Sequence, residues 1–172
     1  MTATRQTGYF EDFTVGDVFE HRRGRTFSQA ENARWSLATM NTAQAHWNSE
    51  SMKTYLNGQF DRPLMNAAIV LSVGVGLTSQ DMSENMFREL ALDELRISIP
   101  CFPDDTVTAV STVIQTAPSD DFAHSGQLDY SVVLTNQHGQ EVCSFRRSVL
   151  LKRRSHWLQA DLDFADTHWP QA

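Results

Sequence analysis

Two side chains in the polar stretch between residues 41 and 48 have the chemistry to act on a water molecule. An imidazole, such as that of His46, takes up and releases protons near neutral pH. Asn41, five residues earlier, has no proton-accepting carboxylate, but its carboxamide both accepts and donates hydrogen bonds. The spacing alone also fits a loop or capping histidine at His46 and a helix C-cap at Asn41, because asparagine tolerates left-handed backbone. A catalytic role therefore needs support from the rest of the sequence.

Charge and composition argue against several other kinds of site. The 172-residue chain has a formal net charge of −7, which disfavours nucleic acid because binding phosphate backbones needs a strong positive field. One basic cluster, Arg146-Arg147 with Lys152–Arg154, is either a solvated strand end or a phosphate contact for a nucleotide-bearing substrate. Cys101 and Cys143 have no metal-ligand spacing, so we expect no metal site. The sequence contains no Gly-rich phosphate loop and no Gly-x-Ser-x-Gly motif.

The length and the distribution of apolar residues indicate one soluble domain. Single domains commonly run to roughly 100–200 residues. Residues 1–13 lack the apolar centre of a signal peptide, and the longest apolar-rich run, residues 67–77, is too short to span a bilayer. We therefore expect a cytoplasmic protein with no membrane partner.

A first helix is expected immediately before the polar stretch. Ser28–Glu31 fits a capping box, in which the serine hydroxyl caps an orphan N–H and the glutamate reaches back. The helix is expected to end at about Met40, with Trp35 and Leu37 supplying much of its apolar surface. A short helical turn is expected over residues 50–56.

The most informative helix candidate is the run at residues 67–77, which is apolar nearly all round. A helix of this kind must be buried on most sides. Its β-branched residues and two glycines are poor helix formers, so propensity alone also permits a strand. We favour a helix because Gly74 and Gly76 would let a sheet wrap closely around it, and because of the resemblance described below.

After residue 86 the apolar pattern changes to a period of two, which is typical of strands. Strands are expected over Leu92–Ile99, Thr106–Val113, Leu128–Leu134 and residues 140–152, and a hairpin turn is expected at Asn136–Gly139. An earlier strand is expected to begin at Val18. Strands that follow the helix and pair in sequence order predict an α+β fold with an antiparallel sheet.

The remaining aromatic and histidine residues receive weaker assignments. Residues 155–172 contain Trp157, Phe164 and Trp169, which either pack on the body or a neighbouring subunit or belong to a disordered tail. His124 is expected in a loop, and His21 on a strand facing solvent.

Seven segments, in their order and spacing, resemble the MaoC-like hydratase/dehydratase family, which contains the (R)-specific enoyl-CoA hydratases and the mesaconyl-CoA-type hydratases. The matching segments are Tyr9–Phe13, Val15–Asp17, Gly24–Thr26, Thr39–Asn48, Arg62–Asn66, Phe102–Thr106 and Val142–Arg147. The resemblance implies a single α+β hot-dog domain over residues 1–154, with residues 155–172 as an extension. A long central helix, at about residues 65–79, would lie in a curved antiparallel sheet. It also implies a homodimer or higher homo-oligomer, because hot-dog subunits usually build their sites where two sheets meet.

The activity that the resemblance implies is the addition or removal of water at an enoyl or 3-hydroxyacyl thioester. The acyl group would be carried on CoA or an acyl carrier protein, so that CoA or phosphopantetheine belongs to the substrate and no separate cofactor is expected. In the family's usual loop an Asp stands five residues before a His. Here Asn41 stands at the Asp position and His46 at the His position. The resemblance thus implies a water oriented by Asn41 and activated mainly by His46.

Four more residues are candidate substrate contacts. The family often has a His-Gly pair at the start of the central helix, and this chain has Asn66-Ala67. The backbone N–H of Ala67 would support the thioester oxygen, whereas Asn66 is either a substrate contact or a simple N-cap. Trp47 either shapes the acyl pocket or packs in the core. Ser79 either lines the pocket mouth or belongs to a turn, which is the simpler interpretation.

Other functions on the same fold stay open at this point, because a fold does not by itself fix an activity. A thioesterase would need a carboxylate at the carbonyl carbon, and residues 66–79 contain none. The Asn at position 41 and the Ala at position 67 also fit a non-catalytic acyl-binding or assembly subunit. A biosynthetic enzyme that uses the scaffold for different chemistry is a further alternative.

Overall fold

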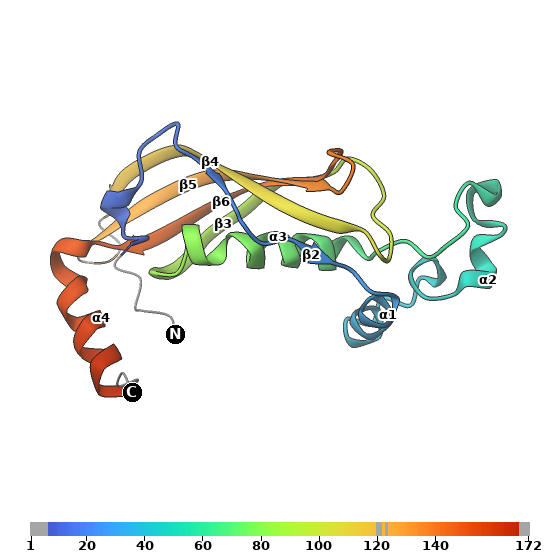
Figure 1. Cartoon of the computed structure of the whole chain (residues 1–172), viewed down its shortest axis with the longest axis horizontal. Coiled ribbons are helices and arrows are strands. Elements are labelled where there is room, and N and C mark those ends of the chain that lie inside the picture. The colour runs from blue at the N-terminus through green and yellow to red at the C-terminus, as the bar shows by residue number, and fades with distance from the viewer. Residues whose placement is uncertain (1–6, 120–121, 123, 169–172) are drawn as a thin grey trace.

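A computed structural model describes residues 7–119, 122 and 124–168. Its elements are η1 (Phe10–Asp12), β1 (Val18–Glu20), β2 (Arg25–Thr26), α1 (Gln29–Ala38), η2 (Gln44–His46), α2 (Ser49–Met52), η3 (Tyr55–Gly58), α3 (Ala67–Met82), β3 (Met86–Ile97), β4 (Thr106–Ser119), β5 (Ser125–Asn136), β6 (Glu141–Lys152) and α4 (Arg154–His168), where η marks a 3-10 helix. The strands form one antiparallel sheet in the order β1-β4-β5-β6-β3, and β2 also pairs with β4. The curved sheet arches over α3, with α1 and α2 beyond one end and α4 at the other (Figure 1). The expected α+β arrangement is confirmed, but the expected pairing in sequence order holds only for β4, β5 and β6, because β3 pairs with β6 and not with β4.

The long strands follow from the period-two pattern, and their turn follows from its residue types. Leu128–Leu134 places every second side chain in the core, so the expected shared face is confirmed. Asn136 ends β5, and its side-chain oxygen accepts the N–H groups of His138 and Gln140 at 3.0 and 3.1 Å. Gly139 follows with φ of 73°, where a side chain would be strained. The hairpin turn is therefore confirmed. Among the described helices, none is both long and apolar enough to cross a bilayer.

The central helix α3 packs into the concave face of the sheet, and it is longer than the expected residues 65–79. Its buried positions are Ile69, Val70, Gly74, Thr78 and Met82, which recur at a helical spacing. At Gly74 an added Cβ would lie 2.7 Å from Leu134 Cδ1 and 2.8 Å from Phe145 Cε1. Gly74 therefore permits the close approach that the sequence predicted.

The opposite side of α3 differs from the expectation. Gly76 is exposed and an added Cβ there meets nothing within 4 Å, so its predicted role in close packing is wrong. Ala68 and Ser72 are also exposed. Within the described residues the helix is therefore covered along one stripe, although its sequence is apolar nearly all round.

Paired alanine substitutions test this difference between the two glycines. Gly74→Ala should lower the free energy of unfolding by about 1–3 kcal/mol, because the new methyl group overlaps packed side chains. Gly76→Ala should raise it by up to about 1 kcal/mol, because alanine is the better helix former and nothing opposes the methyl group. Urea denaturation followed by circular dichroism measures both values, and equal effects at the two sites would contradict this account.

Helix α1 begins as expected but ends earlier and presents a different face. The Ser28 hydroxyl accepts the Glu31 N–H at 3.2 Å, while the Glu31 carboxylate binds Arg25 at 2.6 Å. The last turn closes on Met40, whose φ is 57° and whose N–H donates to Leu37, while the Asn41 N–H donates to Ser36. Met40, not Asn41, therefore occupies the left-handed position of this helix end.

The face that α1 turns inward is polar. Asn32 and Ser36, one helical turn apart, are fully buried, whereas Trp35 and Leu37 are 38% and 63% exposed. The expectation that Trp35 and Leu37 form the packing surface is wrong. The inward face meets irregular backbone, whose N–H and C=O groups need polar partners.

His21 also differs from its expected position. It is 6% exposed rather than solvent-facing, and it lies just after β1. Its ring nitrogens contact Asp81 Oδ2 and Ser111 Oγ, each at 2.8 Å. Through these two contacts His21 connects the end of α3 to β4.

The basic cluster is occupied by internal contacts. Arg147 is 2% exposed, pairs with Glu89 and donates to the Tyr130 hydroxyl at 2.7 Å, so a solvated strand end is wrong for this residue. Three more cations of the cluster pair with carboxylates: Arg146 with Asp129, Lys152 with Asp161 and Arg154 with Asp12. The last two pairs connect the sheet to α4 and α4 to η1.

The C-terminal segment forms α4 and packs on the body. Trp157 meets Phe87 edge-on with 5.2 Å between ring centroids, and the Tyr9 hydroxyl donates to Asp161 at 2.9 Å. Phe164 stays 51% exposed. Trp169 lies outside the described residues.

Candidate active site

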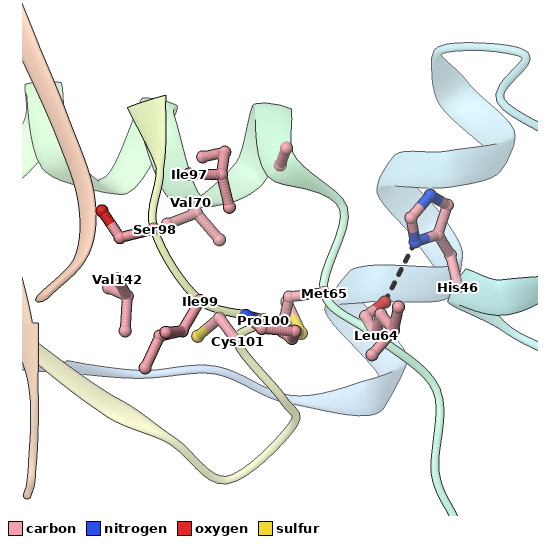
Figure 2. Close-up of a pocket in the computed structure, with 11 residues that line it drawn as sticks. His46, Leu64, Met65, Val70, Ile97, Ser98, Ile99, Pro100, Cys101 and Val142 are labelled. Atoms are coloured by element: carbon pink, nitrogen blue, oxygen red, sulfur yellow. Dashed lines mark hydrogen bonds between the residues drawn. The ribbon is translucent and has the colours of Figure 1, made fainter. Parts of the chain in front are cut away.

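A cavity of about 280 Å³ lies between the start of α3 and the chain that leaves β3 (Figure 2). Its lining residues are His46, Leu64, Met65, Ala67, Val70, Ile97, Ser98, Ile99, Pro100, Cys101 and Val142. The wall is thus apolar, with the imidazole of His46 at one side. An apolar hollow with a few polar groups is the usual form of a small-molecule site.

His46 is held in a defined orientation at this cavity. Its Nδ1 atom lies 3.0 Å from the backbone oxygen of Leu64, and Figure 2 shows this contact. A carbonyl oxygen can only accept, so the neutral imidazole carries its proton on Nδ1. The lone pair then belongs to Nε2, which is the form that a general base requires.

The loop that carries His46 is held by the buried side chain of Asn32. The Asn32 amide donates to the carbonyl oxygens of His46 at 2.7 Å and Leu64 at 2.8 Å. Its own oxygen accepts the N–H of Asn66 at 2.9 Å. One carboxamide therefore connects α1 to the loop that carries His46, to Leu64 and to Asn66, the N-cap of α3. The name Asn32 clamp is used below for these three bonds.

Two backbone bonds extend the Asn32 clamp to the cavity wall. The Leu64 N–H donates to Ala45, and the Met65 N–H donates to Cys101, both at 2.8 Å. The backbone oxygen of Leu64 thus accepts hydrogen bonds from His46 and Asn32, and its backbone N–H donates to Ala45. Because each of these backbone groups has a partner, the position of the imidazole is fixed relative to the start of α3.

The start of α3 provides a further polar feature. Asn66 is the N-cap, and its side-chain oxygen accepts the Ala68 N–H at 3.0 Å. Asn66 is buried, and it is not among the residues that line the cavity. Ala67 does line the cavity, and its N–H is one of the first-turn amides that have no acceptor within a helix.

Three predicted site residues besides Asn66 lie outside the cavity lining. The Asn41 side-chain oxygen accepts the Ala43 N–H at 3.2 Å, in a turn that begins the histidine loop. Trp47 follows His46 and is 42% exposed. Ser79 donates to the Gly76 carbonyl within α3 at 2.8 Å, about 18 Å along the helix from Ala67. The structure thus brings His46 and Ala67 to one cavity and leaves these three beside or away from it.

Asn32 is the residue that the sequence reasoning missed. Its signal was present, because Asn32 and Ser36 form a polar i, i+4 pair on a helix whose large apolar residues do not form one stripe. Cys101 was considered only as a metal-ligand candidate, yet it lines the cavity. Both cysteines are free and buried, and the described residues contain no group of three metal-ligating side chains.

The whole-chain pattern matches one described family. Residues 1–165 match the family model for mesaconyl-CoA hydratase. The chain belongs to the mesaconyl-CoA hydratase family. This places it within the wider hydratase/dehydratase group that the sequence motifs resemble.

Individual relatives agree with this assignment. The mesaconyl-CoA hydratase of Haloarcula hispanica is 27% identical over 158 residues, covering 88% of this chain and 42% of the relative. That of Cereibacter sphaeroides is 30% identical over 146 residues, covering 85% of this chain and 41% of the relative. The chain therefore spans about two-fifths of the length of these relatives.

Solved structures confirm the hot-dog fold. A Mycobacterium tuberculosis protein described as having a double hotdog fold superposes with a TM-score of 0.77 and 20% identity, over 88% of this chain and 46% of that one. An unliganded R-hydratase from Pseudomonas aeruginosa superposes with a TM-score of 0.69 and 12% identity, over 85% and 86% of the two chains. At these identities the likeness concerns the fold alone.

Substitution of Asn32 by aspartate tests the clamp with almost no change in shape. Aspartate has no N–H groups for the two carbonyls and places a carboxylate beside them, so Asn32→Asp should lower the free energy of unfolding by roughly 3–5 kcal/mol. Asn48→Asp is the matched control. Asn48 caps α2 through its oxygen, and aspartate caps equally well. Its amide N–H donates only to the exposed side chain of Gln44, whose own amide can turn its N–H groups toward a carboxylate, so the effect should stay within about 0.5 kcal/mol. Urea denaturation distinguishes the two, and a similar small loss in both would contradict the clamp.

Proposed function

We propose that the protein adds water to, or removes water from, an enoyl or 3-hydroxyacyl thioester. The observation that carries the proposal is the orientation of His46, whose Nδ1 is tied to Leu64 while the ring borders an apolar cavity at the start of α3. Relatives support the reaction type, since they are named mesaconyl-CoA hydratase and, in Chloroflexus aurantiacus, beta-methylmalyl-CoA dehydratase. These names also favour CoA over an acyl carrier protein as the carrier.

In this proposal His46 supplies the acid–base chemistry. Its Nε2 atom takes a proton from water as the water oxygen bonds to the β-carbon, and the electron pair of the double bond moves toward the thioester carbonyl. The imidazolium that forms then donates a proton to the α-carbon. The N–H of Ala67, at the positive end of α3, supports the carbonyl oxygen as it gains negative charge. Dehydration uses the same groups with the proton transfers reversed.

Asn41 has a narrower role in the proposal than the sequence implied. Its oxygen already accepts the Ala43 N–H, so its amide N–H groups are the ones best placed to hold a water. An amide N–H can orient that water but cannot take its proton. His46 is therefore the single base, and Asn41 is a positioning residue.

The competing thioesterase function finds less support. Helix α3 extends beyond the expected residues and includes one carboxylate, Asp81. This residue lies about 21 Å along the helix from Ala67 and bonds to His21. A carboxylate at that distance does not reach a thioester held at the start of the helix.

Replacement of His46 tests the enzymatic proposal. His46→Gln keeps a side chain of similar size but removes the base, so kcat/KM for hydration of crotonyl-CoA should fall by about 10²–10⁴-fold. His138→Gln, at the exposed hairpin between β5 and β6, is the matched control and should retain parent activity. Hydration is followed by loss of enoyl-thioester absorbance. Equal activity of the His46 variant and the parent would exclude the assigned role.

We also propose a homodimer joined along β3. This strand is an edge of the sheet, and Leu92, Leu95 and Ile97 on it are 43%, 46% and 42% exposed. Exposed apolar edges normally have a covering partner. Two further features support a second hot-dog module beside β3 and α3. Within the described residues one side of α3 is uncovered, and the relatives are more than twice as long as the region that they share with this chain.

The dimer is tested by light scattering after size-exclusion chromatography. The parent should have twice the mass of one chain, and Leu95→Glu should shift it toward a single chain because the edge then carries an added charge. Val15→Glu is the control, since Val15 is even more exposed, at 57%, but lies in the turn before β1. A parent that runs as a single chain at all concentrations would refute the dimer.

A further inference from the structure

The cavity beside His46 has a wall without positive charge. Apart from His46, Ser98 and Cys101, the lining side chains are hydrocarbon or thioether. Burial raises the pKa of the Cys101 thiol to about 12, so the thiol is neutral at physiological pH. No lysine or arginine is among the lining residues that the structure describes.

The rim of the same cavity carries a negative charge. The Ser98 hydroxyl, at the cavity edge, donates to Glu141 Oε1 at 2.7 Å. Hydrogen bonds from Ser98 and Ser144 hold the pKa of the Glu141 carboxyl below its usual range, so it is ionised near neutral pH. The charge of Arg96 lowers the same pKa, so this cation is matched by Glu141 and leaves no net positive charge at the rim for a substrate carboxylate.

A second arginine, just before Leu64 in the sequence, is directed elsewhere. The Arg62 guanidinium, just before the segment that holds Leu64, lies 4.6 Å from the centroid of the Phe102 ring. Phe102 in turn packs against Phe60 with 5.7 Å between ring centroids. Neither arginine nor ring is part of the cavity lining.

These observations point to the substrate class, given the proposed function. We infer that the acyl group which enters this cavity is uncharged and apolar at its far end, unlike the carboxylate-ended acyl group of mesaconyl-CoA. An apolar chain gains free energy from leaving water, whereas a carboxylate would lose its hydration with no cation to replace it. The volume of about 280 Å³ lies at the low end of ligand pockets, which suits an acyl group with the pantetheine arm outside.

The first experiment compares two thioesters that differ only at the far end of the chain. Crotonyl-CoA ends in a methyl group and fumaryl-CoA in a carboxylate, and both have four carbons. The parent protein should hydrate crotonyl-CoA with a kcat/KM at least about 100-fold higher. Equal or faster hydration of fumaryl-CoA would overturn the inference and leave the proposed hydratase function intact.

Binding separates the inference from the proposed function. Calorimetry with butyryl-CoA and succinyl-CoA, which cannot be hydrated, measures the preference without turnover. Butyryl-CoA should bind at least about tenfold more tightly. That preference without turnover of either enoyl thioester would refute the hydratase proposal but support the substrate class. Tighter binding of succinyl-CoA would overturn the substrate class.

Charge-changing variants test the cavity itself. Ile99→Lys places a cation in the wall, and it should narrow the crotonyl-to-fumaryl preference by about tenfold or more, whereas Ile99→Met should leave it unchanged. Glu141→Gln removes the rim charge without disturbing the wall, and it should narrow the preference by roughly twofold to fivefold. Circular dichroism verifies that each variant is folded. A preference that stays at the parent value in both Ile99→Lys and Glu141→Gln would contradict the inference.

Discussion

Three hydrogen bonds from one buried carboxamide hold the candidate site together. Asn32 uses both of its N–H groups and its oxygen, on His46, Leu64 and Asn66. These partners belong to segments that no sheet ladder connects, and irregular backbone has no regular partners of its own. The position of the imidazole relative to α3 therefore depends on a side chain that neither touches the cavity nor carries charge.

The same constraint explains why the inward face of α1 is polar. Each bond of the Asn32 clamp satisfies a backbone group, and for the Asn66 N–H it is the partner without which a buried donor would be left unpaired, at a cost of about 1–3 kcal/mol. The carbonyl oxygens of Leu64 and His46 each accept a second bond, from the His46 ring and from Gln29. An apolar residue at position 32 would fill the space but satisfy none of these groups. Trp35 and Leu37 are consequently displaced to the outer side of the helix, where they are exposed. The inward face of α1 thus fixes the position of the His46 loop by hydrogen bonds, and it buries less apolar surface as a result.

The sequence predicted the parts of this protein that depend on periodic patterns. The strands, the hairpin at Asn136 and the position of α3 follow from alternation, turn chemistry and a continuous apolar run. The close approach at Gly74 was predicted from residue size, but Gly76 could not be distinguished from it, because the side of α3 that meets the sheet is set by tertiary packing. At the site, His46 and Ala67 were predicted and do line one cavity. Asn32 was missed because its polar pairing with Ser36 indicates only which face of α1 is polar and does not identify the partners of Asn32, which lie 14 to 34 residues away.

The charge-free wall and the fixed imidazole act together in the proposed chemistry. A neutral histidine with its proton held on Nδ1 presents an acceptor, and an apolar surface beside it limits the number of waters that compete for that acceptor. Because position 41 is an asparagine, it offers no carboxylate that could act as a second base beside His46. The reaction then depends on how well one base is placed and not on how many bases are present. That dependence is consistent with a loop in which the His46 carbonyl, the His46 ring and Leu64 are all fixed by hydrogen bonds before any substrate arrives.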